Sequence, residues 1–410
     1  MTASSQKLPP EICAENEQSF AAYTLRQRLP HIIEQIIASH SYSNHVIYAL
    51  NALGDEIGSG TIQPLSQTDY VDSEIWHRCI QPHVGKSWFT APFFFVEMYF
   101  YRRLGEVIGS LDVTDKANND PFRWQKRKAF DTSFAKAQGL ATCLATKYGD
   151  FGWVASSTEL QQILLANLWS NCADLSQLPT GKSVKQPDDS NQLLIDDSEA
   201  IASFFSHQSQ PLNRVDIILD NVGIELISDL ALADFLITAR LAQQVVLHGK
   251  HQPVFVSDVM RHDIWFTIQS FMVSEFEILR TWGERLESHL RNGAIAIQDH
   301  YFWTLPLDFS AIVPDLLADL SNTDLLISKG DANYRRLVGD RQWNLDTPIS
   351  QIVDYFSFPC VALRVLKSEV LVGVNCDRLQ ELDLEQDWMI NGTHGIIQFV
   401  PPQKLTLTHS

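Results

Sequence analysis

The hydrophobic pattern changes sharply at Asp220. The apolar run at 215–219 is typical of a strand buried on both faces, as in parallel sheets. From residue 224 to about residue 241 the apolar positions recur at helical spacing. A strand that passes directly into a helix places the polar pair between them, Asp220 and Asn221, at the carboxyl edge of the sheet. Ligands bind at this edge in open α/β sheets, so the pair marks either an ordinary loop or the start of a site.

Short apolar runs alternate with helical stretches throughout the chain after residue 210. The strands expected from these runs lie at 215–220, 244–249, 253–258, 294–299 and 324–331, with two more at 360–366 and 369–374. Alternation of strands and helices implies right-handed crossovers and a mainly parallel sheet. We therefore predict an α/β fold in which helices flank the sheet in a Rossmann-like, three-layer arrangement.

The first half of the chain has a helical pattern. Helices are expected at 24–37, 91–109 and 156–175, and the last has a capping-box pair, Ser156 and Glu159. The stretch 176–200 is rich in Ser, Asp, Pro and Gln, as a linker or long surface loop is. The predicted domains are thus an all-helical domain at 1–175, the linker at 176–200 and an α/β catalytic domain at 201–410.

Composition narrows the range of partners. The 410 residues carry a net charge of -18, which argues against nucleic acid or an anionic membrane as a partner. The six cysteines are scattered without a CxxC pair, and the first thirty residues lack the apolar core of a signal peptide. We expect a cytoplasmic protein that neither binds nor spans a membrane.

Three of the predicted strands end in the same kind of residues. The first ends in Asp220-Asn221, the third in Ser257-Asp258, and the fifth in Lys329-Gly330-Asp331, followed by Asn333. If the strands are parallel, these ends meet at one edge of the sheet. Oxygen ligands from separate strand ends suit a divalent cation such as magnesium, manganese or cobalt. The alternative is that the Asp residues simply occupy turns and helix caps, where Asp is common.

Four segments in this order resemble the signature segments of the damage-control phosphatases, a family of metal-dependent phosphatases. The segments are LDNVGIELISDL, HGKHQPVFVSDVMRHD, SKGDANYRRLVGDRQW and ALRVLKSEVLVG. The resemblance is greatest to the subgroup of acidic residue methyltransferase 1-like sugar phosphate phosphatases. It implies hydrolysis of small phosphorylated metabolites, such as fructose 1-phosphate, with manganese, cobalt, nickel or magnesium as the cofactor.

The resemblance also implies roles for individual residues. It assigns the metal to Asp220, Asn221 and Asp258, which together with Asp331 form the catalytic set. The implied substrate-binding residues are Glu225, Lys329, Gly330, Asn333, Arg364 and Lys367. Lys329 and Lys367 neutralise phosphate oxygens in this scheme, and Gly330 lets the backbone approach the phosphate. Asp331 either orients or deprotonates the attacking water or has a structural role.

One departure from the subgroup pattern concerns its Arg-Thr-x-Lys motif. This chain has Val365 between Arg364 and Leu366, so the hydroxyl is missing and substrate choice is affected. A covalent aspartyl-phosphate route is disfavoured because position 222 is Val222 rather than a second Asp, so direct attack by water is expected.

Two other functions are compatible with parts of the sequence. An S-adenosylmethionine-dependent protein carboxyl methyltransferase usually has a glycine-rich turn after its first strand, and here Gly223 is the one glycine of that turn. A non-catalytic metabolite-binding protein is the second alternative. The physiological substrate and the oligomeric state are open at this point.

Overall fold

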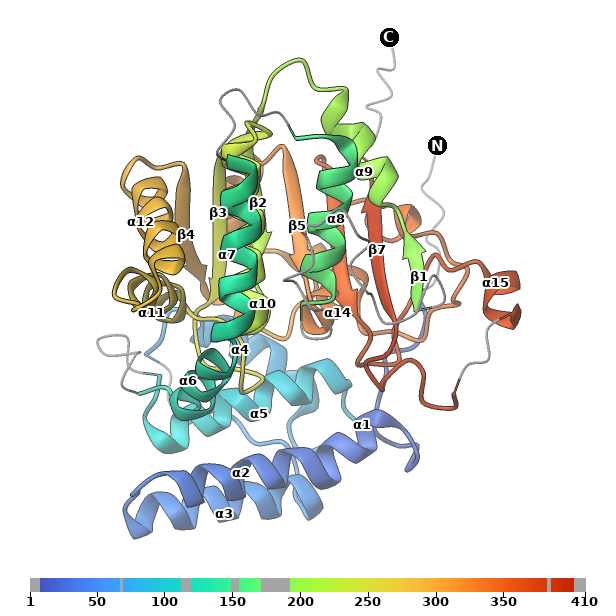
Figure 1. Cartoon of the computed structure of the whole chain (residues 1–410). Helices are drawn as coiled ribbons and strands as arrows, with labels where there is room; N and C mark the ends of the chain where they lie inside the picture. The colour runs from blue at the N-terminus through green and yellow to red at the C-terminus, as the bar shows by residue number, and fades with distance from the viewer. Residues whose placement is uncertain are drawn as a thin grey trace.

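The computed structural model describes residues 8–66, 69–111, 119–148, 155–170, 192–381 and 385–401 (Figure 1). The predicted linker at 176–200 lies outside these ranges up to residue 191. Within the described residues, no helix has both the length and the apolar character needed to cross a membrane.

The N-terminal part is helical, as predicted. Its helices are α1 (Phe20–Tyr23), a π-helical turn (Thr24–Arg28), α2 (Leu29–Ser39), α3 (Asn44–Ser59), α4 (Ser73–Ile80), a 3-10 turn (Gln81–His83), α5 (Phe93–Ile108), α6 (Arg123–Thr132), α7 (Phe134–Tyr148) and α8 (Ser157–Leu168). The capping box predicted for α8 is present, because Ser156 and Glu159 bond reciprocally to each other's backbone N–H groups.

Strands and helices alternate in the remaining chain. The strands are β1 (Leu193–Asp196), β2 (Leu212–Ile218), β3 (Ala242–Lys250), β4 (Ile295–His300), β5 (Leu325–Lys329), β6 (Cys360–Val365) and β7 (Gly395–Val400). The α-helices are α9 (Ser198–Ser206), α10 (Ile224–Thr238), α11 (Arg261–Met272), α12 (Glu277–Arg291), α13 (Pro314–Leu320), α14 (Asp331–Val338) and α15 (Cys376–Glu381). Short 3-10 turns lie at Tyr301–Thr304, Phe309–Ala311 and Ile349–Gln351.

All seven strands form one sheet in the order β1-β7-β6-β5-β2-β3-β4. Every neighbouring pair is parallel except β6 and β7, so the predicted mainly parallel sheet is confirmed. The chain proceeds from β2 through β3 to β4 on one side and then returns to place β5 on the other side of β2. The order therefore reverses between β2 and β5, and α/β proteins bind ligands at the carboxyl ends of the strands next to such a reversal.

Two of the predicted strands are wrong. Residues 253–258 form a loop after β3, because Pro253 has no N–H to donate and both Phe255 and Val256 have positive φ angles of 49° and 66°. In residues 369–374 the apolar side chains are buried, but the segment joins no ladder. Strand β7 was not predicted, and β1 and the first residues of α9 lie inside the predicted linker.

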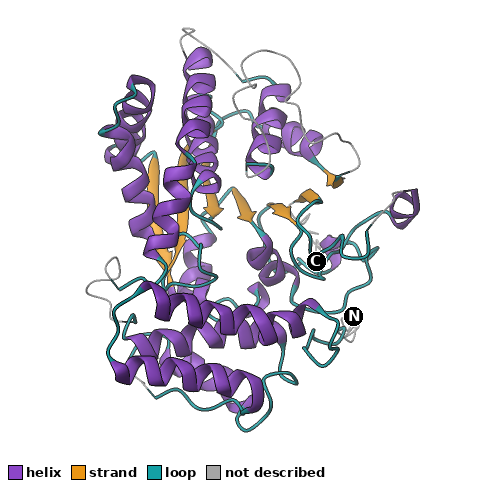
Figure 2. Ribbon diagram, turned by 60° about the horizontal axis from the view of Figure 1, so that its bottom comes forward, coloured by secondary structure: helices purple, strands orange, loops and turns teal. Residues whose placement is uncertain are grey.

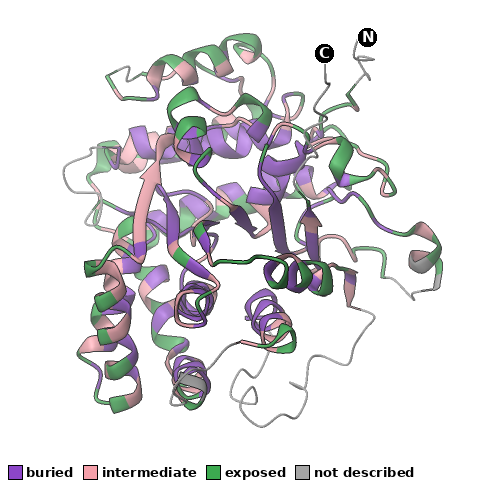
Figure 3. Ribbon diagram, turned by 90° about the horizontal axis from the view of Figure 1, so that it is seen from above, coloured by how far each residue is buried: buried purple, intermediate pink, exposed green. Residues whose placement is uncertain are grey.

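The two faces of the sheet support two hydrophobic cores. Val215, Ile217 and Leu219 pack into one core with helices α7 to α12, whereas Ile218 packs into the other. This alternation follows from the two-residue period of a strand. Helix α10 lies between the sheet and α7 and is buried on nearly all sides, as its almost continuous apolar sequence requires. In Figure 3 the strands are mostly buried and the outer helices have exposed faces.

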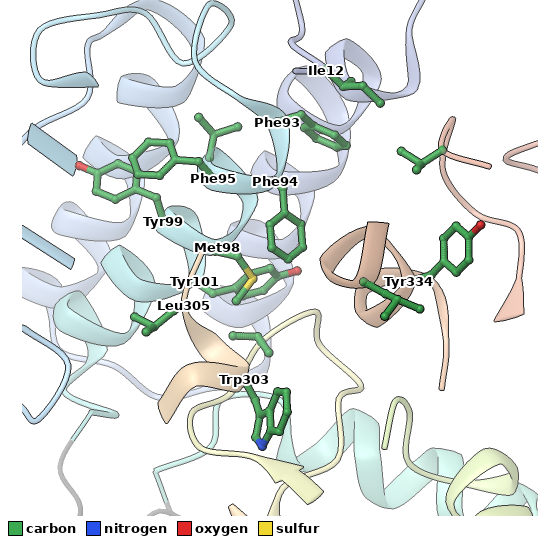
Figure 4. Close-up of a cluster of buried hydrophobic side chains, with 14 of the residues drawn as sticks. Ile12, Phe93, Phe94, Phe95, Met98, Tyr99, Tyr101, Trp303, Leu305 and Tyr334 are labelled. Atoms are coloured by element: carbon green, nitrogen blue, oxygen red, sulfur yellow. The ribbon is translucent and has the colours of Figure 1, made fainter. Parts of the chain in front are cut away.

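The N-terminal helices contribute to the second core. Helix α5 runs beside the sheet with α2 and α3 outside it (Figures 1 and 2). Its aromatic residues Phe93, Phe94 and Tyr101 pack in the same cluster as Trp303 and Tyr334 (Figure 4). The helical part thus shares a core with the sheet, and α7 and α8 cover its opposite face. The predicted domain boundaries at residues 175 and 201 stay a prediction.

The ion pairs of Arg335 connect the helical part to α14. Its guanidinium, which is buried, contacts Glu97 of α5 at 2.5 Å and Asp340 at 2.7 Å, and Asp340 also accepts a bond from the Phe94 N–H. We expect Arg335→Met to lower the free energy of unfolding by about 3–5 kcal/mol, because two buried carboxylates lose their cation.

Urea unfolding of Arg335→Met measures this loss. The matched control is Arg291→Met, whose side chain is 76% exposed and pairs with Glu287 on the surface. The control should change stability by less than about 1 kcal/mol. Equal effects of the two substitutions would show that the Arg335 contacts contribute no more than a surface pair.

Candidate active site

The turn after β2 pairs with the loop after β3. Asn221 and Asp258 form an isolated antiparallel bridge. The Val222 N–H donates to the Ser257 carbonyl at 2.9 Å, and the Val259 N–H donates to the Asp220 carbonyl at 2.8 Å. This pairing brings together Asp220, Asn221 and Asp258, the three predicted metal ligands. They lie at the carboxyl edge of the sheet, where the strand order reverses between β2 and β5.

The loop reaches this position through a strained backbone. Phe255 and Val256 both have positive φ angles, a conformation that β-branched residues such as valine rarely adopt. Such strain costs on the order of 1–3 kcal/mol per residue and persists only where surrounding contacts enforce it. Here the enforcing contacts are the bridge to Asn221 and a bond from the Lys250 N–H to the Val259 carbonyl at 2.7 Å. The strain places Ser257 and Asp258 against the turn after β2.

The Asn221 amide is held on both sides. Its Nδ2 donates to Asp220 Oδ2 at 2.7 Å and to Glu225 Oε2 at 2.8 Å, while its Oδ1 accepts from Ser257 Oγ at 2.5 Å. Glu225 lies in the first turn of α10, four residues after Asn221. The structure thus joins four acidic or amide side chains of the predicted site, those of Asp220, Asn221, Glu225 and Asp258.

The two aspartates of the site are buried next to each other. Burial raises the pKa of Asp220 well above its ordinary value, and the nearby carboxylates of Asp258 and Glu225 raise it further. Burial also raises the pKa of Asp258 to about 6, although Lys250 opposes this shift. Two buried like charges repel each other, so a cation between them stabilises the charged form of both.

The residues present fit a divalent cation. Asp258 is 1% exposed, and its Oδ2 atom receives no hydrogen bond from any residue that the structure describes. It forms an ion pair with Lys250 at 3.4 Å, and a buried carboxylate oxygen without a hydrogen bond is costly unless something else also binds it. Together with Asp220 and the Asn221 amide, it offers the hard oxygen donors that magnesium and manganese prefer.

Gly330, at the end of β5, lies directly against Asp220. Its φ angle is +83°, and a Cβ atom added to it would lie 2.0 Å from Asp220 Oδ2. Any side chain at this position would therefore displace the Asp220 carboxylate. The predicted approach of phosphate to this glycine stays a prediction, and the structure shows that the glycine admits a carboxylate of the site.

Asp331 begins α14 and is surrounded by donors. Its Oδ1 accepts bonds from Arg364 at 2.8 Å, from the Lys367 N–H at 3.0 Å and from Ser368 Oγ at 3.1 Å. Burial acts to raise the pKa of Asp331, but the Arg364 guanidinium outweighs it and holds the pKa below its ordinary value. Asp331 is thus a well-anchored anion.

Arg364 is directed into the protein. The side chain is fully buried, donates to Ser368 and to the Val370 carbonyl, and stacks on the Tyr334 ring at 4.4 Å. Its predicted substrate contact is untested, and the partners observed for it all belong to the protein. Lys367, by contrast, is exposed beside this cluster.

Lys329 also has partners within the protein. Its ammonium pairs with buried Asp229 of α10 at 3.2 Å and contacts the Asn167 side chain of α8. Asn167 in turn donates to Asp229 at 2.8 Å. These contacts tie the helical part to the end of β5, and the predicted contact of Lys329 with phosphate stays a prediction.

Asn333 is likewise buried, and its amide is satisfied. Its Nδ2 donates to the carbonyls of Leu219 at 3.1 Å and Lys329 at 2.8 Å, and its Oδ1 accepts from Lys250 Nζ at 2.8 Å. Asn333 therefore joins the ends of β2, β3 and β5, and its predicted role with substrate is also untested.

A second acidic cluster lies near α6 and α11. The possible ligand atoms of Asp120, His262 and Asp263 lie within 4.8 Å of one another. The ammonium of Lys126 already lies between the carboxylates, 2.8 Å from Asp120 and 2.9 Å from Asp263. Asp263 also accepts from the Met260 N–H and so caps α11. Lys126 thus already occupies the space between the two carboxylates of this cluster.

Several residues at the site were missed from the sequence. Lys250 and Ser257 lie within a signature segment. However, nothing in the neighbouring sequence indicates that Lys250 contacts Asn333 or that Ser257 contacts Asn221. Asn167 and Asp229 lie inside helical patterns and are brought to Lys329 only by the packing of α8 on the sheet.

Comparison with known sequences identifies the family. The profile described as "Damage-control phosphatase ARMT1-like domain" matches residues 24–382. The chain belongs to this family. Relatives named damage-control phosphatase ARMT1 from Mus musculus and Danio rerio are 32% and 33% identical, over 96% and 97% of this chain and 99% and 98% of their own. The Homo sapiens relative is 32% identical over 96% of this chain and 99% of its own.

A solved structure supports the fold of this family member. The crystal structure of a DUF89 family protein from Pyrococcus horikoshii superposes with a TM-score of 0.50 over 92% of this chain and 97% of that chain. The two are 14% identical, so this likeness concerns the fold alone. The resemblance that the four segments carried is thus confirmed at the level of the family.

Gly330→Ala tests the packing between β5 and Asp220. We expect this variant to lose about 1–3 kcal/mol more stability than Gly392→Ala, because the new methyl group overlaps the Asp220 carboxylate. Gly392 has a similar φ of +78° but nothing within 4 Å of its Cβ position, so its variant shows the backbone cost alone. Unfolding by urea gives both values, and equal losses would mean that Asp220 moves aside freely.

Proposed function

We propose that the protein is a metal-dependent phosphatase that hydrolyses small phosphorylated metabolites. The observation that carries the proposal is the juxtaposition of Asp220, Asn221 and Asp258 with the start of α14 at the point where the strand order reverses. Its family, whose curated relatives are named damage-control phosphatases, supports the same activity.

Asp220, Asn221 and Asp258 would hold the cation. When bound, a divalent cation supplies Lewis-acid polarisation of a phosphoryl oxygen and activation of water. The chain's own contribution is to keep two carboxylates side by side despite their repulsion, and to hold the Asn221 amide next to Asp220. Ser257 and Glu225 fix the plane of that amide.

The phosphoryl group would bind next to the N-terminus of α14. Backbone N–H groups at a helix start favour anions, and Gly330 opens the backbone there. The exposed ammonium of Lys367 is close enough to Asp220 to influence its charge, so it can neutralise a phosphate bound at that carboxylate. Asp331 anchors the Lys367 backbone, and its lowered pKa makes it a weak proton acceptor. We therefore propose that Asp331 orients the attacking water and does not deprotonate it.

Arg364, Lys329 and Asn333 support this site from behind. Arg364 holds Asp331, Lys329 fixes the end of β5 through Asp229, and Asn333 ties β5 to β2. We propose that all three act by positioning the groups that contact the substrate.

The finer parts of the proposal come from the subgroup resemblance. The substrate is a sugar phosphate such as fructose 1-phosphate, and the metal is manganese, cobalt, nickel or magnesium. Val365, which replaces the usual hydroxyl residue, packs partly buried against the core of helices α7 to α12 and offers no hydrogen bond to a sugar. We also propose that the protein is located in the cytoplasm and that its substrates are small phosphate monoesters free in solution.

Metal removal tests the proposed chemistry. Chelator-treated protein should lose phosphate release from fructose 1-phosphate, and added manganese, cobalt, nickel or magnesium should restore it, because Asp220 and Asp258 need a cation between them. Asp258→Asn should lose activity together with metal binding. Full activity in the stripped protein would rule the proposal out, and so would methyl transfer from S-adenosylmethionine without phosphate release.

A comparison of two lysines separates phosphate binding from support. Lys367→Ala should slow hydrolysis by roughly 10- to 150-fold, since a charge-assisted hydrogen bond is worth about 1.5–3 kcal/mol, while leaving stability nearly unchanged. Lys329→Ala should instead lower stability, because buried Asp229 loses its cation. Rate assays with sugar phosphates and urea unfolding measure the two effects. Near-normal kinetics for Lys367→Ala would contradict the phosphate assignment.

A further inference from the structure

Lys250 is a buried cation next to the proposed metal ligands. It is the last residue of β3 and is 2% exposed. An ammonium group has three N–H donors, and here three oxygen atoms lie around it, of which the first two accept hydrogen bonds and the third forms an ion pair. These are Asn333 Oδ1 at 2.8 Å, the Leu219 carbonyl at 3.3 Å and Asp258 Oδ2 at 3.4 Å. They belong respectively to α14, to the end of β2 and to the loop after β3.

The contact with Asp258 differs from those of the other buried lysines described. Lys126 lies 2.8 Å from its carboxylate and Lys329 lies 3.2 Å from its own. Lys250 stays 3.4 Å from Asp258 Oδ2, the longest of these three lysine–carboxylate distances. Lys250 therefore lies close enough to attract the carboxylate but leaves its oxygen available as a ligand.

The two other partners of Lys250, Asn333 and the Leu219 carbonyl, are also hydrogen-bonded to each other. Asn333, which accepts from Lys250, donates to the Leu219 carbonyl that Lys250 also contacts. Leu219 directly precedes Asp220, and Asn333 lies two residues after Asp331. A displacement of the ammonium would thus be transmitted to both aspartates of the proposed metal site and to the start of α14.

We propose that Lys250 is a positioning residue that orients Asp258 and the end of β2 around the bound cation. This inference rests on the proposed metal site and adds a residue to it. Groups that hold metal ligands from outside the ligand set commonly change metal affinity by about 10- to 100-fold when replaced. Removing a lysine also removes its repulsion of the metal, which would raise the metal affinity. A lower affinity therefore indicates a positioning role, and a higher affinity indicates a simple counter-charge.

Binding of manganese to the full-length protein, measured by titration calorimetry and by electron paramagnetic resonance, tests the role of Lys250. We expect Lys250→Met to weaken manganese binding at least tenfold. Lys250→Gln should lose less, because an amide N–H can still donate to Asn333 or to Leu219. The control, Arg102→Met, removes a comparably buried cation that pairs with Asp72 instead, and its affinity should stay within about twofold of the wild type.

Three results would overturn the positioning role. Unchanged or tighter manganese binding by Lys250→Met would show that the lysine is only a counter-charge. Equal losses for Lys250→Met and Arg102→Met would reveal a general effect of removing a buried charge. Equal losses for Lys250→Gln and Lys250→Met would exclude the hydrogen bonds. If Lys250→Met does not fold, the Gln variant alone decides. Wild-type protein that binds manganese but releases no phosphate contradicts the proposed phosphatase activity, while the same comparison still decides the role of Lys250.

Discussion

The arrangement of the site depends on the burial of two carboxylates, Asp220 and Asp258, side by side at the carboxyl edge of the sheet. Such a pair is unfavourable in a folded protein because burial and mutual repulsion both disfavour its charged form. The protein tolerates it through specific local devices. The loop after β3 accepts positive φ angles at Phe255 and Val256. Lys250 provides a cation whose ammonium stays 3.4 Å from Asp258 Oδ2, which leaves that oxygen able to bind another group. The same features are what the proposed binding of a cation to this pair would use.

The topology explains why this pair forms where it does. The reversal of strand order leaves the ends of β2 and β5 adjacent but places their connections on opposite sides. Asp220 follows one strand and Gly330 follows the other, with no space between the glycine and the carboxylate for a side chain. The helical part completes this edge, because α6 approaches closely at Gly223, where a Cβ would meet the Ala129 carbonyl at 3.1 Å. Neither half of the chain builds the surroundings of the site alone.

The sequence predicted the elements that have a local signal. The apolar run before Asp220, the capping box at Ser156 and the alternation of strands and helices each depend on neighbouring residues, and each was confirmed. Residues 253–258 were predicted as a strand because their composition is that of a strand, whereas long-range pairing with Asn221 determines their conformation. The same limit applies to Lys329 and Lys250. Their side chains are the same, but their partners Asp229 and Asp258 become neighbours only in the folded chain.

Charge at the site gives a physical reason for a cation in the proposed reaction. The carboxylates of Asp220, Glu225, Asp258 and Asp331 lie close to the cations of Lys250, Arg364 and Lys367, which leaves the immediate site negative within a chain of net charge -18. Arg364 and Lys250 are buried and already bonded to the protein, so neither can move to meet an anion without exposing an unpaired carboxylate. Lys367 alone cannot offset the repulsion of a phosphate dianion by these carboxylates. In the proposed reaction, a divalent cation held between Asp220 and Asp258 would reverse the sign of the field at close range, and metal binding and phosphate binding would then depend on each other.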